Sequence, residues 1–149
     1  MLFRRTLVVG FLGLAIPLVV GCSGATTGRG AIDPDAPDEY TTTESGLKYR
    51  ILRKSDGKKP KSISHVRVHY DGTLDDGTTF DSTYARGTPA VFRLNEVVAG
   101  FTEGLQLIGE GGMIELDIPP ELGYGENGRA PNIRPNSRLH FVVELIRVF

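Results

Sequence analysis

The sequence predicts an α+β fold in which an antiparallel sheet of about five strands curls around one short amphipathic helix. Three observations lead to this prediction. Apolar residues recur at every second position in several segments, which is the period of strands with one buried face. A single segment has apolar residues at helical spacing. The strands are joined by hairpin-length links, so the alternation of strands and helices that builds a parallel sheet is missing.

The first strands are separated by turn residues. Leu47 to Arg53 alternates apolar and basic residues, and Val66 to Tyr70 again places an apolar residue at every second position. Asp75-Asp76-Gly77 then predicts a tight hairpin, because glycine accepts the positive φ that such turns require. The hairpin would return Phe80-Asp81 to the second strand and form one wall of an aromatic pocket that holds a single acid.

The chain is predicted to be irregular over Tyr84 to Pro89, because glycine and proline there break regular structure. Val91 to Leu94 is a short predicted strand. Met113 to Ile118 is another, which the following two prolines end, and Arg138 to Val148 closes the chain as a long strand. The residues of this last strand that would face inward are Leu139, Phe141, Val143 and Leu145.

One segment has the period of an amphipathic helix, with Asn95 as the candidate N-cap and Gly109 to Gly112 as its end. Gly100 and Gly104 weaken this helix by up to about 1 kcal/mol each relative to alanine, so packing must hold it in place. A twisted sheet around such a helix leaves a concave site between the two. The apolar stripe consists of Val98, Phe101, Leu105 and Ile108.

Residues 1–21 are predicted to be a lipoprotein signal peptide. Arg4 and Arg5 form a positive start, and Leu7 to Val20 is apolar but short for a membrane-spanning helix. The segment leads to Cys22 in a sequence that resembles a lipobox. We therefore expect Cys22 to be lipidated and to anchor an exported protein to the bacterial cell envelope, in the periplasm or on an outer membrane face. An ordinary cleaved signal with an accidental cysteine is the alternative.

Residues 22–43 are predicted to be a flexible tether, and residues 44–149 the folded domain. The tether is rich in glycine, threonine, proline and acidic residues and has too little apolar surface to order itself. As a coil of about 20 residues it would hold the domain roughly 25 Å from the lipid. An additional edge strand here is disfavoured by the prolines.

Composition and motifs exclude several classes of protein. The formal net charge of −1 argues against a nucleic-acid-binding protein, which is usually basic. His65, His69 and His140 are expected on outward polar faces without other ligands at metal-binding spacing, so no metal site is predicted. No nucleophile motif is present, and the single cysteine is taken by the lipobox. Gly123 to Gly128 matches a dinucleotide-binding pattern, but the prolines that follow prevent the required helix, so no cofactor is expected.

Three motifs resemble the signatures of one known family. Val68 to Tyr84 is similar to the first signature of FKBP-type peptidyl-prolyl cis-trans isomerases, Ile118 to Gly125 to the second and Pro135 to Leu145 to the third. The resemblance runs from about Leu47 to Phe149. It implies the FKBP-like half-barrel sheet around one short helix. It also implies isomerase activity on proline-containing polypeptides that are unfolded or partly folded.

The resemblance further implies a role for each pocket residue. Phe101 would form the floor under the prolyl ring, with aromatic walls around it. The Val98 amide and the Tyr124 hydroxyl would bind substrate carbonyls, and Asp81 would orient the pocket through Tyr70 and Arg86. The full set is Tyr70, Phe80, Asp81, Arg86, Val97, Val98, Phe101, Tyr124, Ile133 and Phe141.

The sequence departs from the family pattern at four positions. Phe101 replaces the tryptophan that is common at the floor, and Ala90 stands where a wall phenylalanine is usual. Arg129 replaces a frequent histidine, and Arg134 replaces a proline. The smaller floor and the shortened wall are expected to weaken macrolide inhibitor binding more than catalysis. The helical dimerisation arm of some bacterial members is missing, so a monomer is expected.

Other interpretations remain open on the sequence alone. Taken singly, the strand aromatics could be core residues and Asp81 a surface acid. The domain could also be a binding or chaperone module that kept the fold without efficient turnover, which Ala90 and Phe101 suggest. A purely structural envelope lipoprotein would have neither activity.

Overall fold

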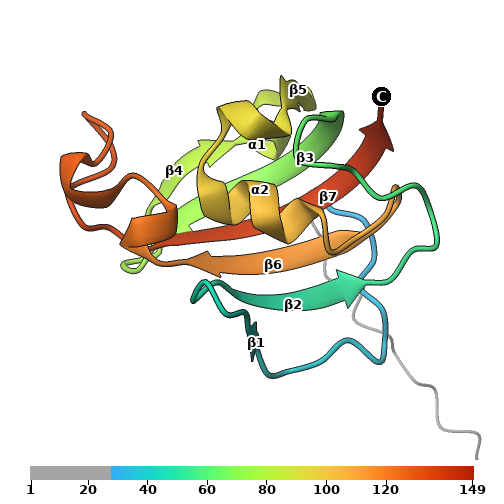
Figure 1. The fold of residues 1–149 in the computed structure, drawn as a ribbon. Helices are drawn as coiled ribbons and strands as arrows, with labels where there is room; N and C mark the ends of the chain where they lie inside the picture. The colour runs from blue at the N-terminus through green and yellow to red at the C-terminus, as the bar shows by residue number, and fades with distance from the viewer. Residues whose placement is uncertain (1–27) are drawn as a thin grey trace, which may run out of the picture.

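One antiparallel sheet organises the computed structural model, which describes residues 28–149 (Figure 1). Its seven strands follow the order β1-β2-β6-β7-β3-β4, and β5 pairs with the beginning of β3. Every strand pair is antiparallel, which confirms the predicted α+β class. The strands are β1 (Thr41–Thr42), β2 (Lys48–Arg53), β3 (His65–Leu74), β4 (Thr79–Ser82), β5 (Ala90–Arg93), β6 (Met113–Ile118) and β7 (Leu139–Val148).

Helix α2 (Ala99–Leu105) lies across one face of the sheet (Figure 1). Gly100 of this helix faces β6, where an added Cβ would lie 2.6 Å from Cγ2 of Ile118. Glycine therefore lets the helix approach the sheet more closely than any larger residue would. The core between the helix and the sheet includes the buried residues Leu47, Val66, Val68, Leu94, Phe101, Leu105, Ile114, Leu116, Ile118, Leu139, Phe141, Val143 and Leu145.

The helix is shorter than predicted and begins later. Asn95 is not its N-cap but belongs to the 3₁₀ turn η1 (Leu94–Glu96), and Val98 occupies the N-cap position. No side chain caps α2; instead the Val98 carbonyl accepts hydrogen bonds from the N–H groups of Phe101 and Thr102 at 3.0 and 3.1 Å. The helix ends at Leu105, before Gly109. Packing of its apolar stripe, not capping, thus determines where it lies.

The predicted irregular segment after β4 contains a short helix, α1 (Thr83–Arg86). The hydroxyl of Ser82 accepts a hydrogen bond from the Ala85 N–H at 3.1 Å, and Gly87 adopts the left-handed conformation that ends the helix. A single turn is too short to show helical periodicity in the sequence. Two further 3₁₀ turns, η2 (Pro120–Leu122) and η3 (Gly125–Asn127), follow β6.

The sheet has seven strands, not about five, because β1 and β4 are too short to show a period of their own. Strand β7 lies between β6 and β3 and pairs with both over most of its length. Its alternating residues Leu139, Phe141, Val143 and Leu145 are buried as predicted, so the closing strand forms the centre of the sheet.

The prediction that no edge strand forms within residues 22–43 is wrong, and the part of this segment that the structure describes contacts the domain. The Asp33 N–H donates to the Leu52 carbonyl at 2.8 Å, and Arg29 forms an ion pair with Asp71 of β3. Thr41–Thr42 then pairs with β2 as an edge strand. Long-range hydrogen bonds hold this segment, and composition alone does not reveal them. Cys22 and the predicted signal peptide lie outside the described residues.

Across residues 28–149, no helix combines the length and apolar character required to cross a bilayer.

Replacing Gly100 by alanine tests how closely α2 approaches the sheet. Helix propensity alone would stabilise Gly100→Ala by up to about 1 kcal/mol. The added methyl group would overlap the β-branched side chain of Ile118, so we expect a net loss of about 1–3 kcal/mol in the free energy of unfolding. Urea unfolding measures this loss. In an Ile118→Ala background the same change should cost less, and a gain in stability in the unmodified chain would contradict the close approach.

Candidate active site

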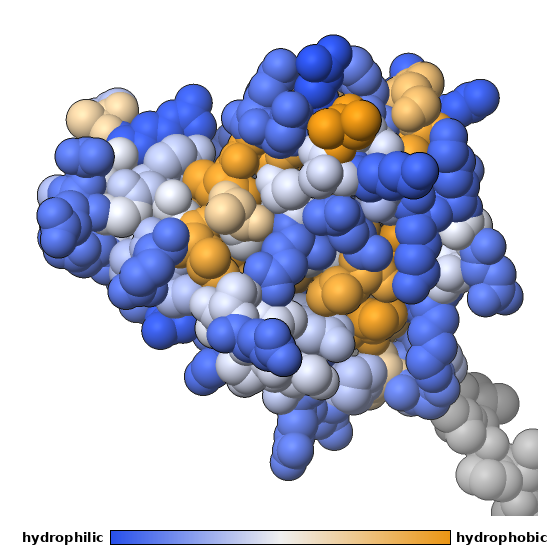
Figure 2. All heavy atoms as spheres, viewed as in Figure 1, coloured by the Kyte–Doolittle hydropathy of each residue, from blue (hydrophilic) through white to orange (hydrophobic). Residues whose placement is uncertain are grey.

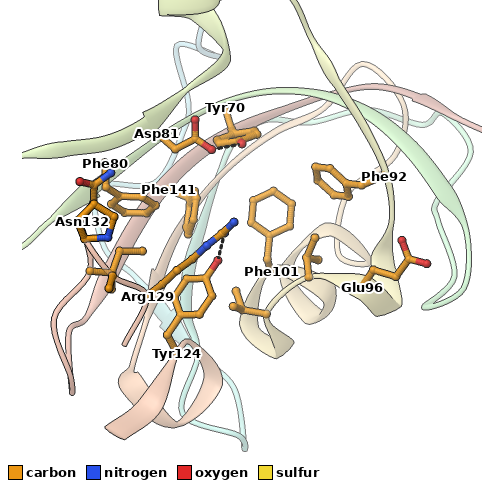
Figure 3. A pocket seen from close by; sticks show the side chains of 15 residues that line it. Tyr70, Phe80, Asp81, Phe92, Glu96, Phe101, Tyr124, Arg129, Asn132 and Phe141 are labelled. Carbon is orange, nitrogen blue, oxygen red and sulfur yellow. Dashed lines mark hydrogen bonds between the residues drawn. The ribbon is translucent and has the colours of Figure 1, made fainter. Parts of the chain in front are cut away.

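A cavity of about 740 Å³ opens between α2, the sheet and the loop that follows β6 (Figure 3). In the surface view, apolar side chains gather on the face that carries α2 and are bordered by polar residues (Figure 2). The cavity is lined by Tyr70, Phe80, Asp81, Phe92, Glu96, Val97, Val98, Phe101, Tyr124, Arg129, Ala130, Pro131, Asn132, Ile133 and Phe141.

The floor of the cavity is the ring of Phe101, which is 4% exposed. The ring centroid of Phe101 lies 5.2 Å from that of Phe141, 6.1 Å from that of Tyr70 and 5.6 Å from that of Phe92. All three pairs meet edge to face, which is a favoured geometry for aromatic rings. Four strands or helices thus contribute rings to one apolar hollow.

The aromatic wall depends on a glycine in β3. Gly72 pairs with Phe141 of β7 on one side and with Asp81 of β4 on the other. An added Cβ there would lie 2.7 Å from Cζ of Phe80 and 2.9 Å from Cε1 of Phe141. The missing side chain lets these two rings meet edge to face with centroids 5.4 Å apart.

Asp81 is the carboxylate of the cavity wall, and two groups hold it. The Tyr70 hydroxyl donates to its Oδ2 at 2.5 Å, and Arg86 forms an ion pair with its Oδ1. Burial alone would raise the pKa of Asp81, but the hydrogen bonds from Tyr70 and Arg86 outweigh it and lower the pKa. Burial and the bond to Asp81 raise the pKa of Tyr70. At neutral pH Asp81 is therefore ionised and Tyr70 is a neutral donor.

Tyr124 reaches the cavity from the loop after β6. Arg129 donates from Nη1 to the Tyr124 hydroxyl oxygen at 2.7 Å, and its guanidinium carbon lies 5.5 Å from the centre of the Tyr124 ring. Because the hydroxyl oxygen already accepts a bond, its own proton is free to donate to a ligand. The backbone N–H of Val98 is a second donor here, and no hydrogen bond within residues 28–149 uses it.

The structure brings nine of the ten predicted pocket residues to the cavity lining. The exception is Arg86, which does not line the cavity but forms an ion pair with Asp81. Phe92 was missed, although its place in a short apolar strand could have indicated it. Glu96 was missed as well. In the loop after β6, which has no periodicity, Tyr124 and Ile133 were predicted, but the remaining lining residues were not; these are Arg129, Ala130, Pro131 and Asn132. Ala90 is half-buried and does not line the cavity.

No group of three or more metal-ligating side chains occurs within residues 28–149. Two of the three predicted outward histidines have side-chain partners of their own. His69 stacks on Tyr84 with ring centroids 4.6 Å apart, and Nε2 of His140 lies 2.6 Å from a carboxylate oxygen of Asp75.

A half-barrel sheet with a short helix over an aromatic hollow defines the FKBP class of domain. Residues 56–146 match the family model described as FKBP-type peptidyl-prolyl cis-trans isomerase, and the chain belongs to this family. The predicted family is therefore confirmed.

Similar proteins come from several bacteria. The probable FKBP-type peptidyl-prolyl cis-trans isomerase of Haemophilus influenzae is 50% identical over 110 residues, which cover 74% of this chain and 46% of that protein. FkpA of Escherichia coli is 50% identical over 107 residues, or 72% of this chain and 39% of that protein. The chain thus matches less than half the length of these two relatives.

Solved structures agree on the fold. The crystal structure of FkpA from Escherichia coli has 48% sequence identity and a TM-score of 0.72, and the match covers 75% of this chain and 52% of that one. The crystal structure of AtFKBP13 has 34% identity and a TM-score of 0.67, with 73% of this chain and 98% of that one covered.

Removing the Tyr70 hydroxyl tests the Asp81 arrangement. Tyr70→Phe deletes one donor while the burial of Asp81 remains, so the pKa of Asp81 should rise. A carboxyl with a lowered folded pKa stabilises the fold while it is ionised, and that contribution is lost as the pH falls through the folded pKa. Carboxyl-carbon NMR titration measures the change. Tyr84→Phe is the matched control, because the Tyr84 hydroxyl donates to Glu144 and not to Asp81. An unmoved Asp81 titration in Tyr70→Phe would contradict the geometry.

Proposed function

We propose that this protein is a peptidyl-prolyl cis-trans isomerase that acts on Xaa-Pro bonds of exported polypeptides. The observation that carries the proposal is the aromatic cavity with Phe101 as its floor and two free hydrogen-bond donors at its edge. The chain's membership of the FKBP-type family supports it.

The chemistry of this reaction suits an apolar site. Rotation about a peptide bond faces a barrier of about 18–20 kcal/mol, which the partial double bond sets. The two isomers at Xaa-Pro differ by only about 0.5–1 kcal/mol, so both are populated and exchange slowly. A twisted amide has lost resonance and with it part of the charge separation of its carbonyl. An apolar cavity tolerates it better than the planar amide, and this difference in binding lowers the barrier.

The cavity residues would have three different roles in the proposed reaction: ring contact, hydrogen bonding to substrate carbonyls, and positioning. Phe101 and Phe141 would surround the prolyl ring and exclude water. The Tyr124 hydroxyl would donate to the carbonyl of the residue before proline, and the Val98 N–H would donate to a carbonyl beyond it. Asp81 would hold the Tyr70 ring in place through their hydrogen bond. The reaction makes and breaks no covalent bond, so it needs no nucleophile or general base.

A second proposal is that the domain binds unfolded clients without efficient turnover. Phe101 supports this proposal, because its ring gives a smaller floor than tryptophan would. The two proposals differ in what the cavity residues do. Catalysis requires Tyr124 and Phe101, whereas simple holding of a client would survive their replacement.

Peptide turnover separates these proposals. For the full chain in mild detergent, we expect accelerated isomerisation of short Xaa-Pro peptides. Tyr124→Phe removes a donor to the carbonyl, and Phe101→Leu removes ring contacts; each should lower kcat/KM about tenfold, which corresponds to roughly 1–2 kcal/mol. Circular dichroism controls for folding, and Tyr84→Phe is the matched hydroxyl deletion outside the cavity.

A macrolide inhibitor should suppress turnover only at high concentration. Rates at background, with holdase activity intact in both variants, would favour the binding module.

We also propose that the protein is exported and anchored through a lipid on Cys22. The support comes from the sequence, where a positive start and an apolar stretch precede a lipobox-like segment. Two acyl chains on one cysteine are sufficient for stable anchoring.

Changing Cys22 to serine tests the anchor. Cys22→Ser removes the thiol that would carry the lipid, so the protein should move from the membrane fraction to the soluble fraction when cells are fractionated. Ser23→Cys in the Cys22→Ser background is the control, since it restores a thiol one position away from the lipobox. Membrane retention of Cys22→Ser would overturn the lipobox interpretation.

A further inference from the structure

The side chain of Arg129 places its positive charge at the mouth of the cavity, beside the proposed prolyl site. Its guanidinium donates one hydrogen bond to the Tyr124 hydroxyl and lies against the Tyr124 ring. Figure 3 shows the Arg129 side chain extending into the space between Tyr124 and the aromatic rings of the sheet. The charge is therefore next to the group that would bind the reacting carbonyl.

The fold fixes the backbone that carries this side chain. The Arg129 N–H donates to the Ile133 carbonyl at 2.7 Å, and the Ile133 N–H donates back at 2.9 Å. Ile133 is buried in the cavity wall. Gly128 adopts φ +61°, and an added Cβ there would lie 2.5 Å from the Ile133 carbonyl oxygen. The backbone of Arg129 is thus fixed by its paired hydrogen bonds to Ile133 and by the conformation of Gly128.

The guanidinium has no carboxylate partner within residues 28–149, as none of the ion pairs there includes Arg129. Two acids line the same cavity. Asp81 is occupied by Arg86 and Tyr70. Glu96 lies on the far side of the Phe101 ring from Arg129 (Figure 3). The cavity mouth therefore has an available positive charge at the Tyr124 side and a negative charge at the opposite side.

Resting on the isomerase function proposed above, the geometry points to Arg129 as a specificity-determining residue that favours an acidic residue immediately before the proline. The carbonyl bound by the Tyr124 hydroxyl belongs to that residue. A guanidinium bonded to the same hydroxyl lies within reach of that residue's side chain. It presents five N–H donors, one of which Tyr124 uses, and a planar fork of this kind matches a carboxylate. Among Xaa-Pro segments of unfolded chains, those with Glu or Asp before the proline are thus favoured over neutral segments of the same size.

Two peptides that differ only in charge test this preference. Ala-Glu-Pro-Phe and Ala-Gln-Pro-Phe have side chains of the same size, so the ratio of their kcat/KM values isolates the carboxylate. For the full chain in non-ionic detergent at low salt, we expect the glutamate peptide to be favoured about two- to fivefold, the range of an exposed charge pair. Raising the salt to about 0.5 M should bring the ratio toward one, because salt screens exposed charges.

Variants assign the effect to Arg129. The ratio should fall to about one in Arg129→Gln and stay above one in Arg129→Lys. Arg134→Gln is the matched control, because it removes an equal charge from the same loop at a residue that lines a neighbouring hollow and not this cavity. The two peptides are compared within each protein, so the ratio of their kcat/KM values remains informative even where a variant lowers both values.

Each contrary outcome overturns the inference. A ratio of one in the unmodified chain, a preference that persists in Arg129→Gln, or an equal loss in Arg134→Gln would remove Arg129 from this role. A preference seen only when the glutamate follows the proline would refute the position assigned to the carboxylate. Turnover of the glutamine peptide with a ratio of one defeats this inference alone, whereas no turnover of any peptide defeats the proposed function as well.

Discussion

Edge-to-face packing of Phe101 against the rings of the sheet is the contact on which the site depends. Phe101 is carried by α2, a helix of seven residues without a side-chain cap, so its position is set almost entirely by the surface it packs on. Gly100 lets the helix settle against Ile118, and Gly72 lets Phe80 and Phe141 meet beneath it. Glycine at position 100 of the helix and at position 72 of the sheet thus permits the close packing that surrounds the hollow.

Successive residues of β3 contribute to opposite faces of the sheet. Tyr70 faces the cavity and donates to Asp81, whereas its neighbour Asp71 faces the other side of the sheet, as successive strand residues do. There Asp71 forms an ion pair with Arg29 of the N-terminal segment. The segment that leads toward Cys22 is therefore fastened to the face opposite the cavity.

Charge in the cavity is distributed unevenly. Asp81 is paired within the wall, which keeps it ionised and keeps Tyr70 in place. Arg129 and Glu96 have no ion-pair partner within the described part of the chain and stand on opposite sides of the floor. The apolar floor of the cavity thus lies between two unlike charges that no ion pair within the described residues neutralises.

The sequence by itself determined the antiparallel class, the long closing strand and its buried face, because period-two burial and turn glycines are local properties of the chain. The central place of that strand in the sheet came from the tertiary structure. The resemblance of three motifs then identified nine of the fifteen residues that line the cavity. Tertiary structure decided what no local pattern carries. The N-terminal segment is held by hydrogen bonds to residues far along the chain. Helix α2 follows Val98 and not Asn95 as its N-cap, because packing positions the helix. Arg129 contacts Tyr124 because the backbone at Gly128 and Ile133 folds an aperiodic loop back over the cavity.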